Sequence, residues 1–291
     1  MIWSSFPIKK ITKGQKNYPR FFLALENPPE SIYYRGSLAI INKGRSIAIV
    51  GSRKMTRYGA QVIDQFVAAF VSEGIATISG FMYGVDTEVH RKTVEYGGIT
   101  VAVMGGGIDE PYPADNNDLY TDIVQKNGAV ISEYEPKSKP KLWMYPQRNR
   151  IVASLATLGV LVIEAGEESG SLITVEYAKK LNKNIFAIPG PITSAVSRGT
   201  NMLIKKGIAK IVTKPEDIIG VSQKPDVKTQ ERMNNLNSIE KKIYFLLKND
   251  EMTIDEIAVK LRENAAVVSA IVSMLSLRGL VSEAGGRYFV V

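Results

Sequence analysis

Short apolar runs alternate along most of the chain with longer segments whose apolar residues recur at helical spacing. The runs predict strands at residues 46–50, 75–79, 99–104, 129–132, 158–163, 184–188 and 209–212. The segments between them predict helices at residues 58–74, 86–96, 116–126, 146–156, 172–181 and 202–206. This alternation indicates an α/β fold with an extended Rossmann-like, doubly wound and mostly parallel sheet.

The pattern also divides the chain into segments. Residues 1–40 form a basic lead, interrupted by prolines, that we expect to pack on an α/β domain of residues 41–220. Residues 221–235 are polar, contain Pro225 and show no apolar period, so they predict a linker. Residues 236–291 then form a second, smaller domain.

Three helices and a hairpin are predicted in the smaller domain. The pattern gives helices at residues 239–248, from 253 onward and at 264–277, and strands at residues 279–282 and 287–291 joined through Gly285 and Gly286. Thr253 and Glu256 have the spacing of a capping box that starts the second helix. This order is typical of a winged helix. The third helix has no basic residue before Arg278, which disfavours a transcription factor and favours a structural or protein-contact role.

Several predicted strands end in loops rich in glycine, serine or arginine. In sheets of this kind ligands bind at the carboxyl ends of the strands. The loops contain Gly51, Ser52 and Arg53; Ser79 and Gly80; Gly105 to Gly107; Glu164 to Ser171; and Pro189 with Gly190. We therefore expect one edge of the sheet to carry the binding site. The sequence has no clear GxGxxG with a well-placed ribose-binding acid, so a dinucleotide site of the usual kind has little support.

The stretch from Val162 to Glu176 combines a strand, a small-residue loop and a helix start. Backbone N–H groups at such a helix start bind phosphate, and the helix dipole favours an anion. Ser169, Ser171 and Thr174 would add hydroxyl donors, and Gly170 would let a ligand approach the backbone. The alternative is an ordinary strand–helix turn with serine caps.

Residues 137–150 form a basic segment with interleaved aromatic side chains. Its cations and rings are Lys137, Lys139, Lys141, Trp143, Tyr145, Arg148 and Arg150. Cations that contact phosphates and rings that stack on exposed bases suit single-stranded nucleic acid. The alternative is a solvated loop whose rings pack on the core, and an alternative role for one of the two arginines is an ion pair with Glu133 or Glu164 inside the fold.

Composition narrows the chemistry. The chain has no cysteine and only one histidine, His90, which excludes thiol chemistry and a multi-histidine metal site. We expect no cofactor and no bound metal, although composition alone does not exclude carboxylate-bound magnesium. His90 is assigned a structural or capping role. No apolar run reaches membrane-spanning length and residues 1–10 lack a signal-peptide core, so we expect a cytoplasmic protein without membrane contact.

The net charge of +8 suggests a polyanionic partner. Residues 236–291 contain seven basic and seven acidic residues, whereas residues 1–235 contain 30 basic and 22 acidic residues. If the protein binds nucleic acid, its first part does most of the binding.

A series of short stretches matches one known family in the family's order. The stretches are Tyr18-Pro19, Pro29 to Gly36, Ile49 to Arg53, Ser79-Gly80, Gly84 to Asp86 with His90, Gly106 to Asp109, Tyr112-Pro113, Ser132-Glu133, Tyr145 to Arg150, Ser169 to Thr174, Pro189-Gly190, and Gly199 to Asn201 with Leu203-Ile204. On these residues the chain resembles the DprA/Smf family of DNA-processing proteins over about residues 18–220.

The resemblance implies a homodimer that binds and protects single-stranded DNA and loads the recombinase RecA during natural transformation, with no catalysed reaction. The nucleic-acid-binding residues expected are Gly51, Ser52, Arg53, Gly80, Lys141, Tyr145, Arg148, Asn149, Arg150, Ser169, Gly170, Ser171, Thr174 and Asn201. Tyr145 stands where many members have phenylalanine, which preserves a ring for stacking.

The alternative function is a phosphoribohydrolase similar to Rossmann-fold enzymes that cleave nucleotide N-glycosidic bonds. Those enzymes have a glycine-rich phosphate loop and a glutamate one turn into the next helix, and residues 170–176 are similar. The two-glycine loop of that family is missing here. Glu167 and Glu168 would also repel a nucleotide phosphate.

Overall fold

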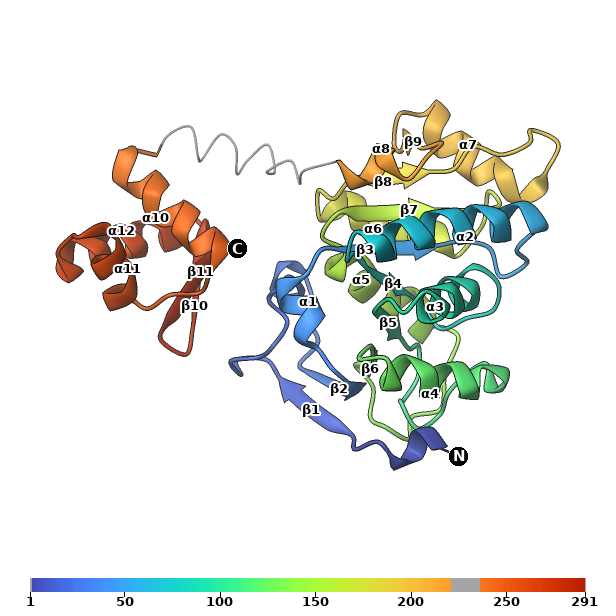
Figure 1. Ribbon diagram of the computed structural model, residues 1–291, viewed down its shortest axis with the longest axis horizontal. Helices are drawn as coiled ribbons and strands as arrows, with labels where there is room; N and C mark the ends of the chain where they lie inside the picture. Colours follow the sequence, from blue (N-terminus) through green and yellow to red (C-terminus); the bar gives the residue numbers. More distant parts are fainter. Residues whose placement is uncertain (1, 221–235, 291) are drawn as a thin grey trace. The chain divides into compact units, whose positions relative to one another are not determined.

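The computed structural model describes residues 2–220 and 236–290 (Figure 1). The predicted linker, residues 221–235, lies outside the described residues. The described residues form two compact units, residues 2–11 with 21–220 and residues 12–20 with 236–290. The domain boundaries given by the sequence pattern stay predictions.

The larger unit is built on a sheet whose strands run in the order β1-β2-β6-β5-β4-β3-β7-β8-β9. The strands are β1 Lys9–Thr12, β2 Ser31–Gly36, β3 Ser46–Val50, β4 Ala76–Ser79, β5 Thr100–Val103, β6 Ala129–Ser132, β7 Gly159–Val162, β8 Ile185–Ala187 and β9 Lys210–Ile211. The strands from β6 across to β9 pair in parallel, and β2 pairs antiparallel with β6. The seven predicted strands and their mostly parallel sheet are therefore confirmed.

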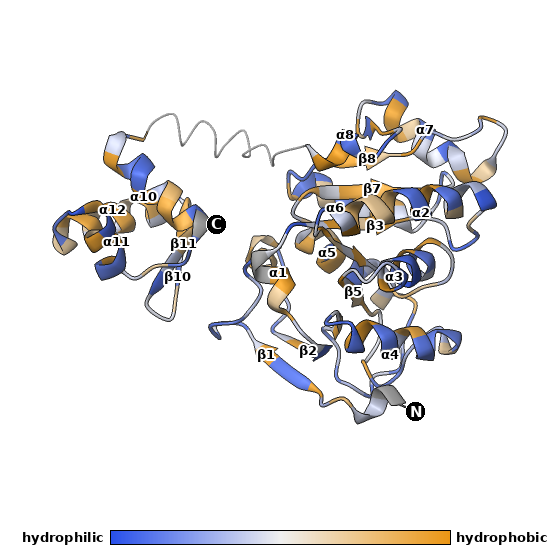
Figure 2. Cartoon of the chain, viewed as in Figure 1, coloured by the Kyte–Doolittle hydropathy of each residue, from blue (hydrophilic) through white to orange (hydrophobic). Residues whose placement is uncertain are grey.

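Helices cover both faces of this sheet. The helices are α1 Ala39–Lys43, α2 Arg57–Ser72, α3 Val85–Glu95, α4 Asn117–Gln125, α5 Met144–Leu155, α6 Ser171–Lys180, α7 Arg198–Lys205 and α8 Glu216–Ile219, with short 3₁₀ turns at Ile2–Ser5, Arg20–Ala24, Ala114–Asn116 and Ala195–Ser197. In Figure 1, α2, α3 and α4 lie on one face and α5 and α6 on the other. Every residue of β3 to β8 is buried, because strands covered on both faces are apolar throughout. Figure 2 shows β7 as hydrophobic along its length.

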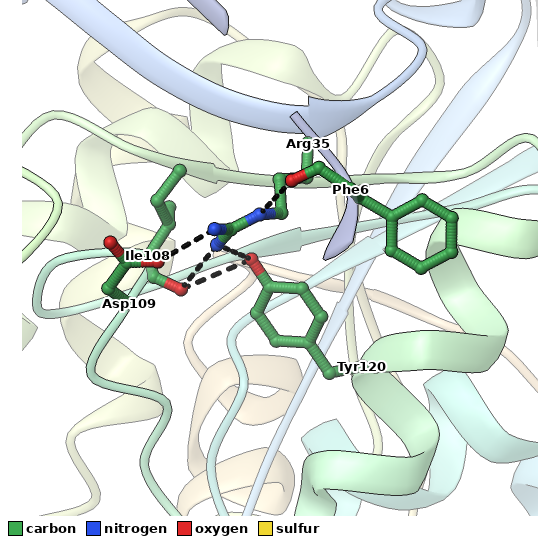
Figure 3. A network of polar contacts seen from close by, with 5 residues as sticks. All are labelled: Phe6, Arg35, Ile108, Asp109 and Tyr120. Carbon is green, nitrogen blue, oxygen red and sulfur yellow. Dashed lines mark hydrogen bonds and ion pairs between the residues drawn. The ribbon is translucent and has the colours of Figure 1, made fainter. Parts of the chain in front are cut away.

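The N-terminal lead contributes β1 and β2 to the sheet, which the hydrophobic pattern did not predict. Arg35 on β2 is 3% exposed, and its guanidinium reaches four partners (Figure 3). It donates to the carbonyls of Phe6 at 2.8 Å and Ile108 at 3.2 Å, pairs with Asp109 at 2.7 Å and donates to Tyr120 Oη at 3.3 Å. A buried guanidinium is tolerated only with such partners. The cluster fixes β2 to the loop that follows β5.

The smaller unit contains three helices and one hairpin in the predicted order. They are α10 Ser238–Asn249, α11 Ile254–Leu261, α12 Ala265–Leu277, β10 Val281–Ala284 and β11 Arg287–Val290. Thr253 and Glu256 form the predicted capping box at the start of α11, and Asn237 and Glu240 form a second at α10. This unit has its own apolar core, built around Ile243, Leu247, Ile257, Val268, Val272 and Leu275.

His90 lies on α3 in the interior of the larger unit and is 0% exposed. Its Nδ1 is 2.7 Å from Thr100 Oγ1, and its Nε2 bonds the carbonyl of Gly80. Because a carbonyl only accepts, Nε2 carries the proton and Nδ1 accepts from the threonine hydroxyl. Burial lowers the pKa of His90 to about 4, so the imidazole is neutral and structural at physiological pH.

His90 makes the stability of the protein depend on pH. Its pKa is about 6.5 unfolded and about 4 folded, so the unfolded chain binds more protons between these values. The free energy of unfolding should therefore fall as the pH drops from 6.5 to 4, by roughly 3 kcal/mol from His90 alone. Denaturant titrations of the native protein and of His90→Gln across this window measure the difference.

The single histidine also gives one unambiguous imidazole Hε1 resonance in NMR spectra. Its chemical shift in the folded protein should not change between pH 8 and about pH 5. An imidazole that titrates near pH 6.5 in the folded state would contradict the assignment.

Candidate nucleic-acid interface

The carboxyl ends of the parallel strands meet at one edge of the sheet, which we call the rim (residues 51–53, 80–84, 105–112 and 164–171). Strand β3 lies between β4 and β7, so the order of the strands reverses direction at the β3–β7 pair. Ligands of doubly wound sheets bind at such a switch point. The loop after β3 and the loop after β7 are therefore neighbours on the edge where we expect the binding site.

The loop after β3 is anchored by its backbone. Ser52 N–H donates to the carbonyl of Glu164 at 2.7 Å, and the carbonyl of Ser52 accepts from Val85 N–H at 3.1 Å. A Cβ on Gly51 would lie 2.7 Å from Val85 Cγ2, so this approach requires glycine. The Arg53 side chain remains exposed at the surface.

Arg53 lies beside an aromatic ring. Its guanidinium carbon is 5.7 Å from the ring centroid of Tyr145, on the first turn of α5. The ring packs on Gly105, where an added Cβ would lie 2.5 and 2.8 Å from Cδ1 and Cε1 of the tyrosine. Burial raises the pKa of Tyr145, so its phenol is neutral at physiological pH. A cation and a held ring thus share one part of the rim.

Helix α5 joins this part of the rim to the loop after β7. Tyr145 and Asn149 are four residues apart and share one helix face. The amide of Asn149 donates to the carbonyl of Gly170 at 3.2 Å. The predicted residues Arg53, Tyr145, Asn149 and Gly170 are therefore brought together on one surface.

The other two candidate residues of α5 lie in the interior. Arg150 is 7% exposed and forms a two-point ion pair with Glu133, at 3.0 and 2.6 Å. Arg148 is 4% exposed and donates to the carbonyl of Val103. Their contact with nucleic acid stays a prediction, and the structure gives both guanidinium groups partners inside the fold.

Gly80 lies between the buried guanidinium of Arg148 and the half-buried carboxyl group of Asp86. A Cβ at this position would lie 2.6 Å from both Nη atoms of Arg148 and would also meet Oδ2 of Asp86. Burial raises the pKa of Asp86, and the nearby charge of Arg148 opposes that rise. Asp86 also accepts from Ser79 Oγ at 3.0 Å. Gly80 is buried and its carbonyl is bound by His90, so its position is structural.

The loop before α6 places three of its four candidates at the surface. Ser169 Oγ and Ser171 Oγ are 2.8 Å apart, and no side chain caps the helix at Gly170. A Cβ on Gly170 would meet nothing within 4 Å, so the space beside it is open. Thr174 is 1% exposed and belongs to the core instead.

The N-terminus of α2, which follows the first strand of the alternating pattern, is occupied by the chain itself. The carboxylate of Glu164 is 2% exposed and accepts from Thr56 N–H at 2.9 Å and from the Thr56 hydroxyl. The carboxylate satisfies the N–H of Thr56, the N-cap residue, and its negative charge complements the helix dipole. It also takes the place where a nucleotide phosphate would bind in such a fold. This role was not predicted, although an acid directly after a buried strand was visible in the sequence.

The lysines of the basic segment face solvent. Lys137, Lys139 and Lys141 are all exposed in the loop that precedes α5. The backbone of this loop is fixed to the loop after β5, because Gly107 N–H donates to the Ser138 carbonyl at 2.8 Å. These cations can therefore contact a polyanion that lies along the rim.

Asn201 closes a neighbouring loop. Its amide donates to the carbonyl of Gly190 at 3.0 Å and accepts from Gly190 N–H at 3.2 Å. Tyr58 Oη donates to the carbonyl of Pro189 at 2.7 Å in the same turn. Asn201 therefore holds the loop after β8 through two hydrogen bonds to Gly190. Its contact with nucleic acid stays a prediction.

Two exposed tyrosines that were not among the predicted binding residues lie on loops of the rim. Tyr83 follows β4 and Tyr112 follows β5, and they are 43% and 46% exposed. Their ring centroids are 6.2 Å apart at an interplanar angle of 81°. The available signal was an aromatic residue inside a loop that follows a predicted strand of the sheet.

The described residues include no group of three or more histidine, cysteine, aspartate or glutamate side chains arranged to hold a metal ion. Within residues 2–220 and 236–290, no helix combines the length and the apolar character that a membrane crossing requires.

Comparison with known proteins agrees with this geometry. The family model described as DNA recombination-mediator protein A matches residues 9–223. The DNA processing protein DprA of Bacillus subtilis is 35% identical over 211 residues, which are 72% of this chain and 70% of that protein. The crystal structure of DprA from Streptococcus pneumoniae superimposes with a TM-score of 0.69 and 34% identity, covering 77% of this chain and 76% of that one.

A further solved structure is that of DNA processing protein A from Helicobacter pylori, described in terms of its single-stranded DNA binding mode. It has a TM-score of 0.67 and 28% identity, and the match covers 74% of this chain and 95% of that chain. Since the family model spans most of the chain and the Bacillus protein exceeds 30% identity, the chain belongs to the DprA family of DNA-processing, recombination-mediator proteins.

Proposed function

We propose that the protein binds single-stranded DNA along the rim, through a surface made of Arg53, Lys141, Tyr145, Asn149 and the loop of Ser169 to Ser171. The observation that carries this proposal is the exposed Arg53 guanidinium 5.7 Å from the Tyr145 ring at the switch point of the sheet. The single-stranded DNA binding mode of the Helicobacter relative supports the choice of ligand.

Single strands fit this surface better than duplexes because their bases are free to stack. A base placed on Tyr145 would bring its phosphate near Arg53 and the exposed lysines of the preceding loop. In a duplex the bases are already stacked, and only the phosphate contacts remain. Selectivity for single strands therefore depends on the ring, and the salt dependence depends on the cations.

We further propose that the bound strand is protected and handed to RecA during natural transformation. We also propose a homodimer that acts in the cytoplasm. Membership of a recombination-mediator family supports this part of the proposal. It is tested by RecA filament assembly on DNA covered with single-strand-binding protein, which should be faster when this protein is added.

We propose that the protein catalyses no reaction. The phosphoribohydrolase alternative needs a nucleotide phosphate at a helix start, and Glu164 occupies the start of α2. At α6 the exposed Glu167 and Glu168 would repel a phosphomonoester. Incubation with nucleoside monophosphates should release no ribose 5-phosphate, and release above a heat-inactivated control would contradict the proposal.

Arg53→Ala should weaken binding to single-stranded DNA by tenfold or more, about 1.4 kcal/mol. The substitution removes a phosphate contact and the cation beside Tyr145. Fluorescence anisotropy of labelled oligonucleotides in a salt series measures the affinity. The slope of log affinity against log salt should become shallower by about 0.7, the value for one phosphate contact on a single strand.

Arg91→Ala is the matched control because it makes the same change in charge. Arg91 lies on α3 with a side chain 58% exposed, and it pairs with Glu88 at 3.0 Å outside the rim. It should bind like the native protein. Equal losses in the two variants would mean that only net charge matters and would remove Arg53 from the site.

Deletion of residues 236–291 should leave single-strand binding mostly intact. The deleted segment has equal numbers of basic and acidic residues, and the larger unit keeps separate apolar cores of its own. The salt slope of the truncated protein should differ from that of the full chain by less than about one contact. A truncated protein that stays folded but binds tenfold more weakly would show that the smaller domain contacts DNA.

A further inference from the structure

The geometry points to Tyr83 and Tyr112 as a second stacking platform, which receives bases of the single strand beyond the base at Tyr145. This inference rests on the proposed function and extends its site along the rim. The three strands β3, β4 and β5 are adjacent in the sheet, and the loops that follow them carry Arg53, Tyr83 and Tyr112 in that order.

The two rings are open to a ligand. They are 43% and 46% exposed, and because the two rings adjoin each other they expose more ring surface together than a single side chain does. Their edge-to-face arrangement, with centroids 6.2 Å apart, leaves ring surface free for a planar ligand. The platform is close to the first ring. Burial raises the pKa of Tyr145 most, and the neighbouring phenol of Tyr112 raises it further.

Buried hydrogen bonds hold the two loops together. Thr87 Oγ1 donates to the carbonyl of Met82 at 2.7 Å, beside Tyr83. The amide of Asn116 donates to Thr87 Oγ1 at 2.8 Å, and Asn116 N–H bonds the Pro113 carbonyl at 3.2 Å. Thr87 and Asn116 are 9% and 4% exposed. The rings are therefore placed before a ligand arrives, which lowers the entropic cost of binding.

The charge near the platform selects bases over phosphates. Partial burial of the Tyr83 phenol raises its pKa most, and the negative charge of the neighbouring Asp115 raises the pKa further. The Asp115 side chain is itself exposed. A carboxylate repels a phosphate but not a neutral base. Phosphates would follow Arg53 and the lysines, while bases turn toward the tyrosines.

The test compares two oligonucleotides of equal length, one of thymidines and one of abasic sugar-phosphate units. The double variant Tyr83→Ala/Tyr112→Ala should lose tenfold or more in affinity for the thymidine strand, about 1.4 kcal/mol. Its affinity for the abasic strand and its salt slope should equal those of the native protein, because no phosphate contact is removed.

Two controls make the result specific. Tyr83→Phe/Tyr112→Phe keeps both rings and should bind like the native protein. Tyr96→Ala removes a tyrosine of similar exposure, 40%, at the end of α3 remote from the rim, and should also bind normally. Thermal unfolding of each variant confirms that it is folded.

A loss below tenfold on thymidines, an equal loss on the abasic strand, or a tenfold loss in the phenylalanine variant would overturn the inference. These outcomes are separable from a failure of the proposed function. If Arg53→Ala weakens binding and the double alanine variant does not, only the second platform is wrong. If the native protein does not prefer single strands, the proposed function itself is wrong.

Discussion

The geometry of the rim depends on the hydrogen bonds that the carboxylate of Glu164 accepts at the start of α2. This carboxylate accepts from the backbone and the hydroxyl of Thr56, while the carbonyl of Glu164 accepts from Ser52 N–H. One residue at the end of β7 therefore fixes both the loop after β3 and the first turn of the helix that follows. Because a buried carboxylate is stable only when it is paired or hydrogen-bonded, the carboxylate and the N–H and hydroxyl of the N-cap residue Thr56 stabilise each other. Arg53 projects from a loop that is anchored in this way.

A second layer of buried polar groups supports the rim from below. Arg150 and Glu133 form an ion pair whose side chains are 9% and 10% exposed, and loss of one partner would leave a buried charge at a cost of about 3–5 kcal/mol. Arg148 and Asp86 face each other across Gly80, whose carbonyl is bound by the neutral His90. Such networks add little net stability, but they permit few alternative arrangements. We interpret them as the reason that short loops can hold exposed rings and a cation in fixed positions.

The sequence predicted the sheet well because strands buried on both faces are continuous apolar runs with clear ends. Strands β1 and β2 were missed because they lie in a basic, proline-containing segment. The burial of Arg35 on β2 depends on partners that are distant in the sequence, such as Asp109 and Phe6. In the candidate site, the positions of the loops could be predicted from the ends of the strands, but the direction of each side chain could not. Tyr145 and Arg148 are three residues apart on one helix, and only the packing of α5 decides that the ring faces the rim and the guanidinium faces the core. Tyr83 carried too weak a local signal, since an exposed and a buried aromatic residue look alike in sequence; Phe81, two residues earlier, is 1% exposed.

The occupied start of α2 supports the proposal that this sheet binds a polymer rather than a free nucleotide. A nucleotide has one phosphate cluster and needs a single deep anion site, which in doubly wound folds is the helix start that Glu164 fills here. A single strand presents one charge and one planar base at each step, so it binds to several modest contacts in a row. In our proposal the rim supplies contacts of that kind, with the exposed Arg53 and the exposed lysines of residues 137–141 for phosphates and neutral tyrosine rings for bases. Under the proposed function, closing the deep site with the chain's own carboxylate would shift binding from one strong anion contact to many weaker contacts distributed along the rim.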